Sequence, residues 1–104
     1  MKKVINGKTY NTDTAELIGD WHNGYPRNDF RTCSEELFKT SKGAYFIAGN
    51  GGAMTEWGEP CGGTARCGGS GIRPIDEAEA LEWAEQHLDA EEVEKYFGHL
   101  ITEA

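Results

Sequence analysis

The sequence predicts an α+β fold, a small antiparallel sheet of three to five strands with acidic C-terminal helices packed on one face. Two observations lead to this prediction. Short runs of β-branched and aromatic residues between turn signals fill the first three quarters of the chain, and apolar residues spaced three and four apart fill the last quarter. The length of 104 residues suits one modest core. We therefore expect a single domain over residues 1–104, with a glycine-rich loop at 49–71 and an acidic helical segment at 76–101.

The first elements are a hairpin and a short helix. Residues 4–10 read as a hairpin, because Asn6-Gly7 supplies the two positive-φ residues of a type I′ turn between β-favouring neighbours. Thr12 or Asp13 can cap a helix that extends to Trp21, at a cost of about 1 kcal/mol for the glycine inside it. Residues 22–31 are expected to be a loop, because Asn-Gly and proline interrupt regular structure.

The best strand pair covers residues 35–40 and 44–48, where aromatic and aliphatic residues flank a Ser-Lys-Gly connection. This pair is expected at the centre of the sheet. Residues 49–71 hold nine of the fourteen glycines, which predicts a long, irregular and partly mobile loop. Residues 72–75 are a short strand, and Pro74 restricts it to an edge or a strand end.

Two helices are expected at the end of the chain. Asp76 with Glu79 fits a capping box, and Asp89 with Glu92 repeats the pattern. Apolar residues follow each start at helical spacing, so the two helices should pack beside each other and end near Gly98. Trp83 stands at the border of the apolar stripe, and we expect it to complete the core between helix and sheet.

Charge is distributed very unevenly. The chain holds 18 acidic and 10 basic residues, a net charge of −8. Residues 1–74 hold eight acids and nine bases, a net charge of +1, whereas residues 75–104 hold ten acids and one lysine, a net charge of −9. General solubility does not explain such segregation.

The acidic segment also lacks the mixed charges of an ordinary helix surface. Its glutamates and aspartates lie one turn from one another without intervening bases, which costs on the order of 1 kcal/mol in repulsion. Nine acids within residues 76–94 give one charge per roughly 3 Å of helix, close to the ~3.4 Å per charge along one DNA strand. Charge alone leaves two interpretations open. The segment is either a dedicated surface for a cationic or protein partner or a merely solvated helix face.

Other kinds of site find weaker support. Residues 63–68 have the first half of a phosphate-binding P-loop, but Gly69 stands where its lysine should be. Cys33, Cys61 and Cys67 are expected to be free thiols in a reducing cytosol, with a Cys61–Cys67 disulfide or a metal site as alternatives. Cys33 beside a histidine, or a carboxylate pair, could catalyse only if the fold assembled them. We therefore expect a protein that is not an enzyme, without catalytic residues, cofactor or metal ion.

Apolar runs are short throughout the sequence. The longest, residues 44–48, is far below the ~18 residues of a membrane-spanning helix, and the polar residues after Lys3 do not form a signal peptide. We expect no membrane association and a cytoplasmic location in a bacterial host cell. The net negative charge also disfavours direct binding to nucleic acid, and we expect a monomer.

Six segments of the chain together carry a family resemblance: residues 5–12, 37–40, 43–46, 49–53, 72–75 and 79–83. They resemble a family of small acidic proteins encoded by phages and mobile elements, in which we include an anti-CRISPR inhibitor of type I-C effector complexes. They are structural rather than chemically diagnostic, and residues 61–71 have no clear counterpart.

The resemblance implies a non-enzymatic DNA mimic. Inhibitors of this kind present carboxylates to the basic surface with which a Cas subunit holds target DNA near its PAM. The expected contact residues are Glu77, Glu79, Glu82, Glu85, Asp89, Glu91, Glu92 and Glu94. The alternative is a general interaction or adaptor protein that binds through the central hairpin and the loop around Trp57, with a merely solvated acidic face.

Overall fold

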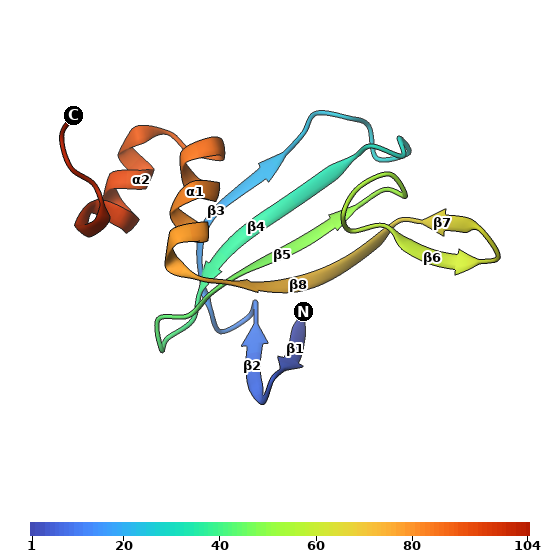
Figure 1. The fold of residues 1–104 in the computed structure, drawn as a ribbon, viewed down its shortest axis with the longest axis horizontal. Coiled ribbons are helices and arrows are strands. Elements are labelled where there is room, and N and C mark those ends of the chain that lie inside the picture. The colour runs from blue at the N-terminus through green and yellow to red at the C-terminus, as the bar shows by residue number, and fades with distance from the viewer.

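The computed structural model describes residues 1–104 and contains eight strands and two α-helices (Figure 1). The strands are β1 (Lys2–Ile5), β2 (Lys8–Asn11), β3 (Glu16–His22), β4 (Cys33–Lys39), β5 (Tyr45–Gly51), β6 (Glu59–Gly62), β7 (Ala65–Cys67) and β8 (Gly69–Ile75). The helices are α1 (Glu77–His87) and α2 (Ala90–Phe97), followed by one 3-10 turn at Gly98–Leu100. Four strands form an antiparallel sheet in the order β3-β4-β5-β8, with both helices at one end of it, which confirms the α+β prediction.

The N-terminal hairpin is also confirmed. Asn6 and Gly7 have φ angles of 53° and 76°, as a type I′ turn requires, and β1 pairs with β2 as a separate two-stranded ribbon. Tyr10 of this ribbon packs edge-on against Phe46 at 5.5 Å between ring centroids, beside Phe38. The hairpin therefore covers part of the sheet face that the helices leave free.

The helix predicted between Thr12 and Trp21 is wrong. The Asn11 side chain accepts from the Asp13 amide at 2.9 Å, and the backbone carbonyl of Asn11 accepts from the Ala15 amide at 3.1 Å. The chain therefore makes a local turn there. It then enters β3, which pairs with β4 over its whole length. A bulge near Ile18 places two successive positions, Ile18 and Gly19, on the buried side, so β3 lacks the strict alternation by which a sequence reveals a strand.

The strands at the centre and edge of the sheet follow the prediction in position but are longer. β4 and β5 lie in the middle and β8, which contains Pro74, lies at an edge. The irregular loop predicted at 49–71 is wrong in large part, because β5 continues to Gly51, β8 begins at Gly69, and β6 and β7 form a projecting hairpin (Figure 1). The position of Gly49 in β5 requires glycine, because a Cβ there would overlap the Trp57 ring.

The cysteine prediction needs correction. Cys61 and Cys67 form a disulfide, with 5.8 Å between their Cα atoms, whereas Cys33 is a free, buried cysteine as expected. The hairpin register explains the pairing, because Pro60 lies opposite Arg66 and a bulge at Cys61 brings the two cysteines together across the strands. Counting cysteines could not reveal a hairpin inside a run of glycines.

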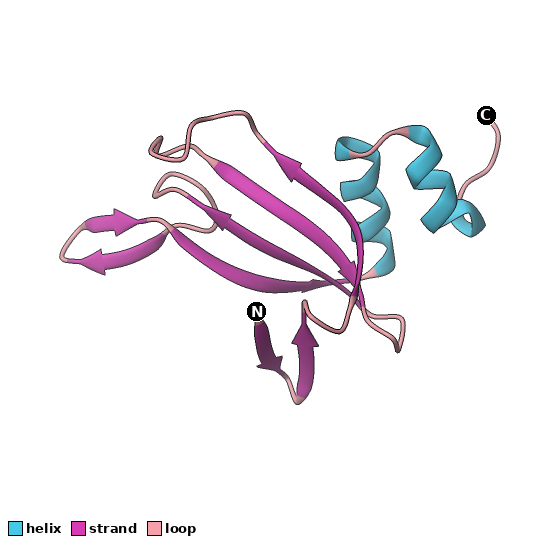
Figure 2. Cartoon of the chain, turned by 180° about the vertical axis from the view of Figure 1, so that it is seen from behind, coloured by secondary structure: helices cyan, strands magenta, loops and turns pink.

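Both helix starts match their prediction. Asp76 accepts from the Glu79 amide at 2.8 Å within a complete capping box, and Asp89 accepts from the Glu92 amide at 2.9 Å. The helices pack on the sheet face opposite the N-terminal hairpin. They lie together at one end of the sheet, as Figure 2 shows. Trp83 is buried in this layer, which confirms its predicted place in the core.

Candidate functional site

The acidic segment folds into a helical hairpin. Glu77 at the start of α1 lies 2.9 Å from Nε2 of His99, which follows the end of α2. The second helix therefore turns back beside the first, as Figure 1 shows. The carboxylates lie in two rows on adjacent helices rather than along one line.

All eight predicted contact residues are exposed. Three of them have structural partners: Asp89 caps α2, the Glu79 carboxylate accepts from the Asp76 amide at 3.4 Å, and Glu77 faces His99. The other five form no side-chain hydrogen bond or ion pair: Glu82, Glu85, Glu91, Glu92 and Glu94. The eight predicted residues, which we call the acidic face, therefore form a dense set of exposed carboxylates, five of them without a side-chain partner.

The folded-back arrangement changes the comparison with nucleic acid. Helix α1 has 11 residues and so measures about 16 Å at 1.5 Å per residue. Residues 76–94 place nine carboxylates within about this length, one per roughly 1.8 Å. Double-stranded DNA carries one charge per about 1.7 Å of axis, so the hairpin matches a duplex in charge density better than the single strand that the sequence suggested.

Arg73 is close to the acidic face without neutralising it. Its side chain lines the same shallow cavity beneath α1 as Glu79 and Glu82. The guanidinium instead pairs with Glu56 and lies 5.6 Å from the centre of the Trp57 ring. The loop before β6 thus supplies the carboxylate with which this cation pairs.

A buried carboxylate that the sequence did not single out anchors α1. Glu35 of β4 is only 5% exposed. Its two oxygens accept from the indole nitrogens of Trp57 and Trp83, each at 2.9 Å. Because Trp83 lies on α1, this contact fixes the rotation of the helix and so the direction of its acidic residues.

Burial shifts the pKa of three groups around Glu35. Burial raises the pKa of Glu56, with the attraction of Arg73 opposing it and the nearby Glu35 adding to it. Burial lowers the pKa of His87, against the attraction of Glu35. Burial also raises the pKa of the Cys33 thiol, the reverse of what a nucleophilic cysteine requires.

The structure brings no catalytic or metal-binding set together at the predicted positions. The His22 ring contacts the backbone carbonyl of Cys33 at 3.1 Å, not its sulfur. No three histidine, cysteine, aspartate or glutamate side chains converge where a metal ion could bind. Neither helix is long and apolar enough to cross a membrane.

The loop around Trp57, expected as part of an adaptor surface, keeps the tryptophan itself away from solvent. Trp57 is buried against the sheet, and its indole N–H donates to the Glu35 carboxylate. Its side chain therefore cannot serve as an exposed contact. The exposed apolar residues nearby are Phe30 and Met54, at 67% and 72% exposure. Their backbones are joined by the Met54 amide donating to the Phe30 carbonyl at 2.9 Å.

No family model, curated protein or solved structure matches this chain.

Proposed function

We propose that the protein is a non-enzymatic inhibitor that docks its acidic face on a basic, DNA-binding surface of a partner protein and so blocks DNA binding. The observation that supports this most is the set of five exposed carboxylates without partners on one helical hairpin. The resemblance of the sequence adds a specific candidate, the PAM-recognition surface of a type I Cas effector subunit.

Physical chemistry favours such a role. Unpaired carboxylates repel one another and cost stability in the free protein, and a lysine- and arginine-lined surface would relieve that repulsion. Because the charge lies at one end of a molecule measuring 50 × 33 × 20 Å, it would steer the protein into a basic groove end-on. Association should be fast and strongly dependent on salt.

The test is binding of the purified protein to a type I-C effector complex, with and without double-stranded target DNA. We expect binding that target DNA competes away and that weakens about tenfold or more between 50 and 200 mM salt. The decisive variant combines Glu82→Lys, Glu85→Lys and Glu91→Lys, and it should abolish binding. Asp89 is left intact because it caps α2, and its loss would cost about 1 kcal/mol of stability.

A matched control reverses three exposed acids away from the helices, Asp13→Lys, Glu36→Lys and Glu59→Lys. This variant has the same net charge as the first and should still bind. Binding that survives the helical reversals, or simultaneous binding of protein and target DNA, would overturn the proposal.

The second candidate function is a general adaptor. The exposure of Phe30 and Met54 favours it, since large exposed apolar side chains often mark protein contacts. Binding through these residues would vary little with salt and would survive the helical charge reversals.

A further inference from the structure

A polar groove of about 790 Å³ lies on the loop end of the sheet, away from the helices. Its floor is the end of β5 and the start of β8, including Asn50 and Gly69. One wall is the loop of residues 23–32, and the other contains Arg66 and Cys67 of β7. Grooves of this size are typical of ligand-binding sites in proteins.

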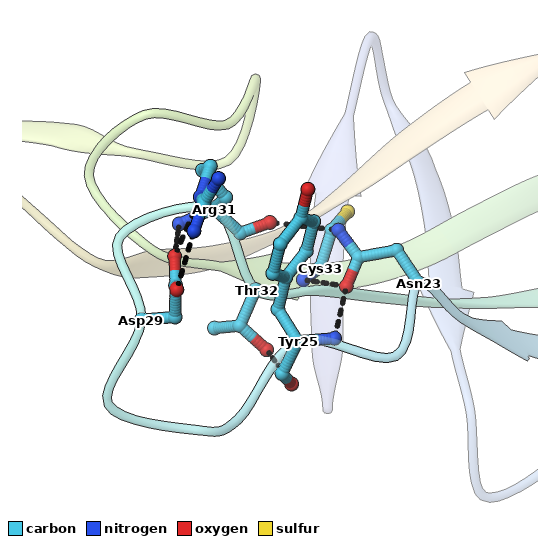
Figure 3. Close-up of polar contacts among 6 residues, drawn as sticks. All are labelled: Asn23, Tyr25, Asp29, Arg31, Thr32 and Cys33. Carbon is cyan, nitrogen blue, oxygen red and sulfur yellow. Dashed lines mark hydrogen bonds and ion pairs between the residues drawn. The ribbon is translucent and has the colours of Figure 1, made fainter.

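The first wall is held by a network of hydrogen bonds (Figure 3). The Asn23 side chain donates to the Arg31 carbonyl at 2.7 Å and accepts from the Cys33 amide at 3.1 Å. Asp29 binds the Arg31 guanidinium through both oxygens, each at 3.0 Å. The loop is therefore set in one shape before any ligand arrives.

The second wall is fixed by different means. The disulfide closes the β6–β7 hairpin, and Arg66 ties it to the preceding loop by donating to the carbonyls of Ala53 and Gly58 at 3.2 and 2.7 Å. Because both walls are held in place before binding, the protein loses less conformational entropy when a ligand binds.

The charges in the groove are cationic and few. Arg27 is exposed and forms no ion pair, and Arg66 adds a second positive charge. The single acid in the lining, Asp29, is already neutralised by Arg31. Phe30 lies in the lining and is 67% exposed, with Met54 beside it.

We propose that this groove binds an extended acidic segment of a protein partner, with one carboxylate on Arg27 and an apolar side chain on Phe30. Charge complementarity points to an anion, and the exposed apolar residues point to a ligand with apolar side chains. A nucleic acid fits less well, because proteins that grip it typically neutralise several phosphates, whereas the groove has one uncommitted arginine.

This site works independently of the acidic face. The long axis of the molecule is 50 Å, several times the screening length of about 8 Å at physiological salt. The loop that carries Arg27 and the helices lie at opposite ends of the sheet, so screening weakens the effect of the helical carboxylates on Arg27 and its ligand. A protein with both sites could hold a basic partner at one end and an acidic segment at the other.

The experiment titrates the full-length ¹⁵N-labelled protein with an eight-residue peptide of alternating Asp and Leu, blocked at both ends. We expect saturable amide shifts confined to the groove, at residues 27–32, 50–53 and 66–69. The Arg27→Glu variant should weaken binding about tenfold or more, because it removes a charge-assisted contact and adds a repulsive one. Phe30→Ala should weaken it several-fold, whereas Lys42→Glu, an equal charge change on the β4–β5 turn, should not alter it.

Two further probes separate the alternatives. The same peptide with Asn in place of Asp should bind at least about tenfold more weakly, and an eight-nucleotide oligo-dT should not bind. Tighter binding of oligo-dT than of the acidic peptide would assign the groove to nucleic acid and overturn the proposal. Shifts outside the groove, no shifts, or equal binding by the Arg27→Glu and Lys42→Glu variants would also overturn it. The helical charge reversals should leave this titration unchanged, so it stands or falls separately from the proposed inhibitor function.

Discussion

Trp83 donates its indole N–H to the buried carboxylate of Glu35 at 2.9 Å, across 48 positions of sequence. The other oxygen of the carboxylate accepts from Trp57, 22 positions away. One acidic residue of the central strand β4 thus ties a helix and a loop to the sheet. The orientation of the acidic face depends on this contact, although no residue in it belongs to that face.

Replacing Glu35 with glutamine should destabilise the protein by about 2 kcal/mol. The amide would present an N–H group to one of the two indoles, which leaves a buried donor without an acceptor. Urea unfolding measures the loss. Glu36→Gln, at the exposed neighbouring position, is the control and should change the free energy of unfolding by less than about 0.5 kcal/mol. Equal stability of the two variants would show that the indole contacts contribute little.

His87 should make stability depend on pH. Its ring stacks on Trp21 at 4.3 Å, and burial lowers its pKa below 6.5 in the folded protein. As the pH falls through about 6.5, the unfolded chain binds a proton that the folded chain does not yet bind, so stability decreases until the folded pKa is reached.

The comparison that isolates this effect is the pH profile of unfolding free energy for the wild type and for His87→Phe, which keeps an aromatic ring. Below pH 6.5, any excess of the wild type over the variant in free energy of unfolding should shrink or reverse. The raised pKa of Glu56 acts in the opposite direction but is common to both proteins. Parallel profiles would contradict the prediction.

Removing the disulfide with Cys61→Ser and Cys67→Ser should loosen the β6–β7 hairpin while the sheet remains folded. Every residue of the two strands is exposed, so no core holds them together. Closing so short a loop contributes about 2 kcal/mol. Trypsin cleavage after Arg66 should therefore become faster, while cleavage after Lys42 in the β4–β5 turn should not. Unchanged cleavage at Arg66 would mean that its own hydrogen bonds suffice to hold the hairpin.

Neutralising part of the acidic face should stabilise the free protein. The double change Glu82→Gln and Glu85→Gln removes repulsion between residues one turn apart, which should raise stability by about 0.5 kcal/mol and Tm by about 2–4 °C at low salt. The gain should shrink in high salt because screening already weakens the repulsion. Glu103→Gln in the exposed C-terminal tail should have no effect. If the double variant is no more stable than the wild type, repulsion between these carboxylates does not lower the stability of the free protein.

Where the sequence prediction succeeded, the signals were local. The Asn6-Gly7 turn and the capping residues Asp76 and Asp89 act through neighbours a few positions away. The aromatic and aliphatic residues on either side of the Ser-Lys-Gly connection likewise placed β4 and β5 in a sheet. Where the prediction failed, a distant partner decided the outcome. Residues 16–22 became a strand because β4 offered hydrogen bonds along the whole segment, and the glycine-rich run became ordered because Trp57 packs on Gly49.

The sequence by itself determined the fold class, both helix starts and the concentration of negative charge at the end of the chain, since each depends on residue type and short spacing. Only the tertiary structure decided how that charge is arranged. The helices fold back into two rows, Glu35 sets the rotation of α1 through Trp83, and Arg73 pairs with Glu56 rather than with a helical carboxylate. The groove beside Arg27 likewise exists only in three dimensions, because its walls come from segments more than thirty residues apart. Contacts between distant residues depend on how the whole chain packs, and a local pattern in the sequence carries no record of them.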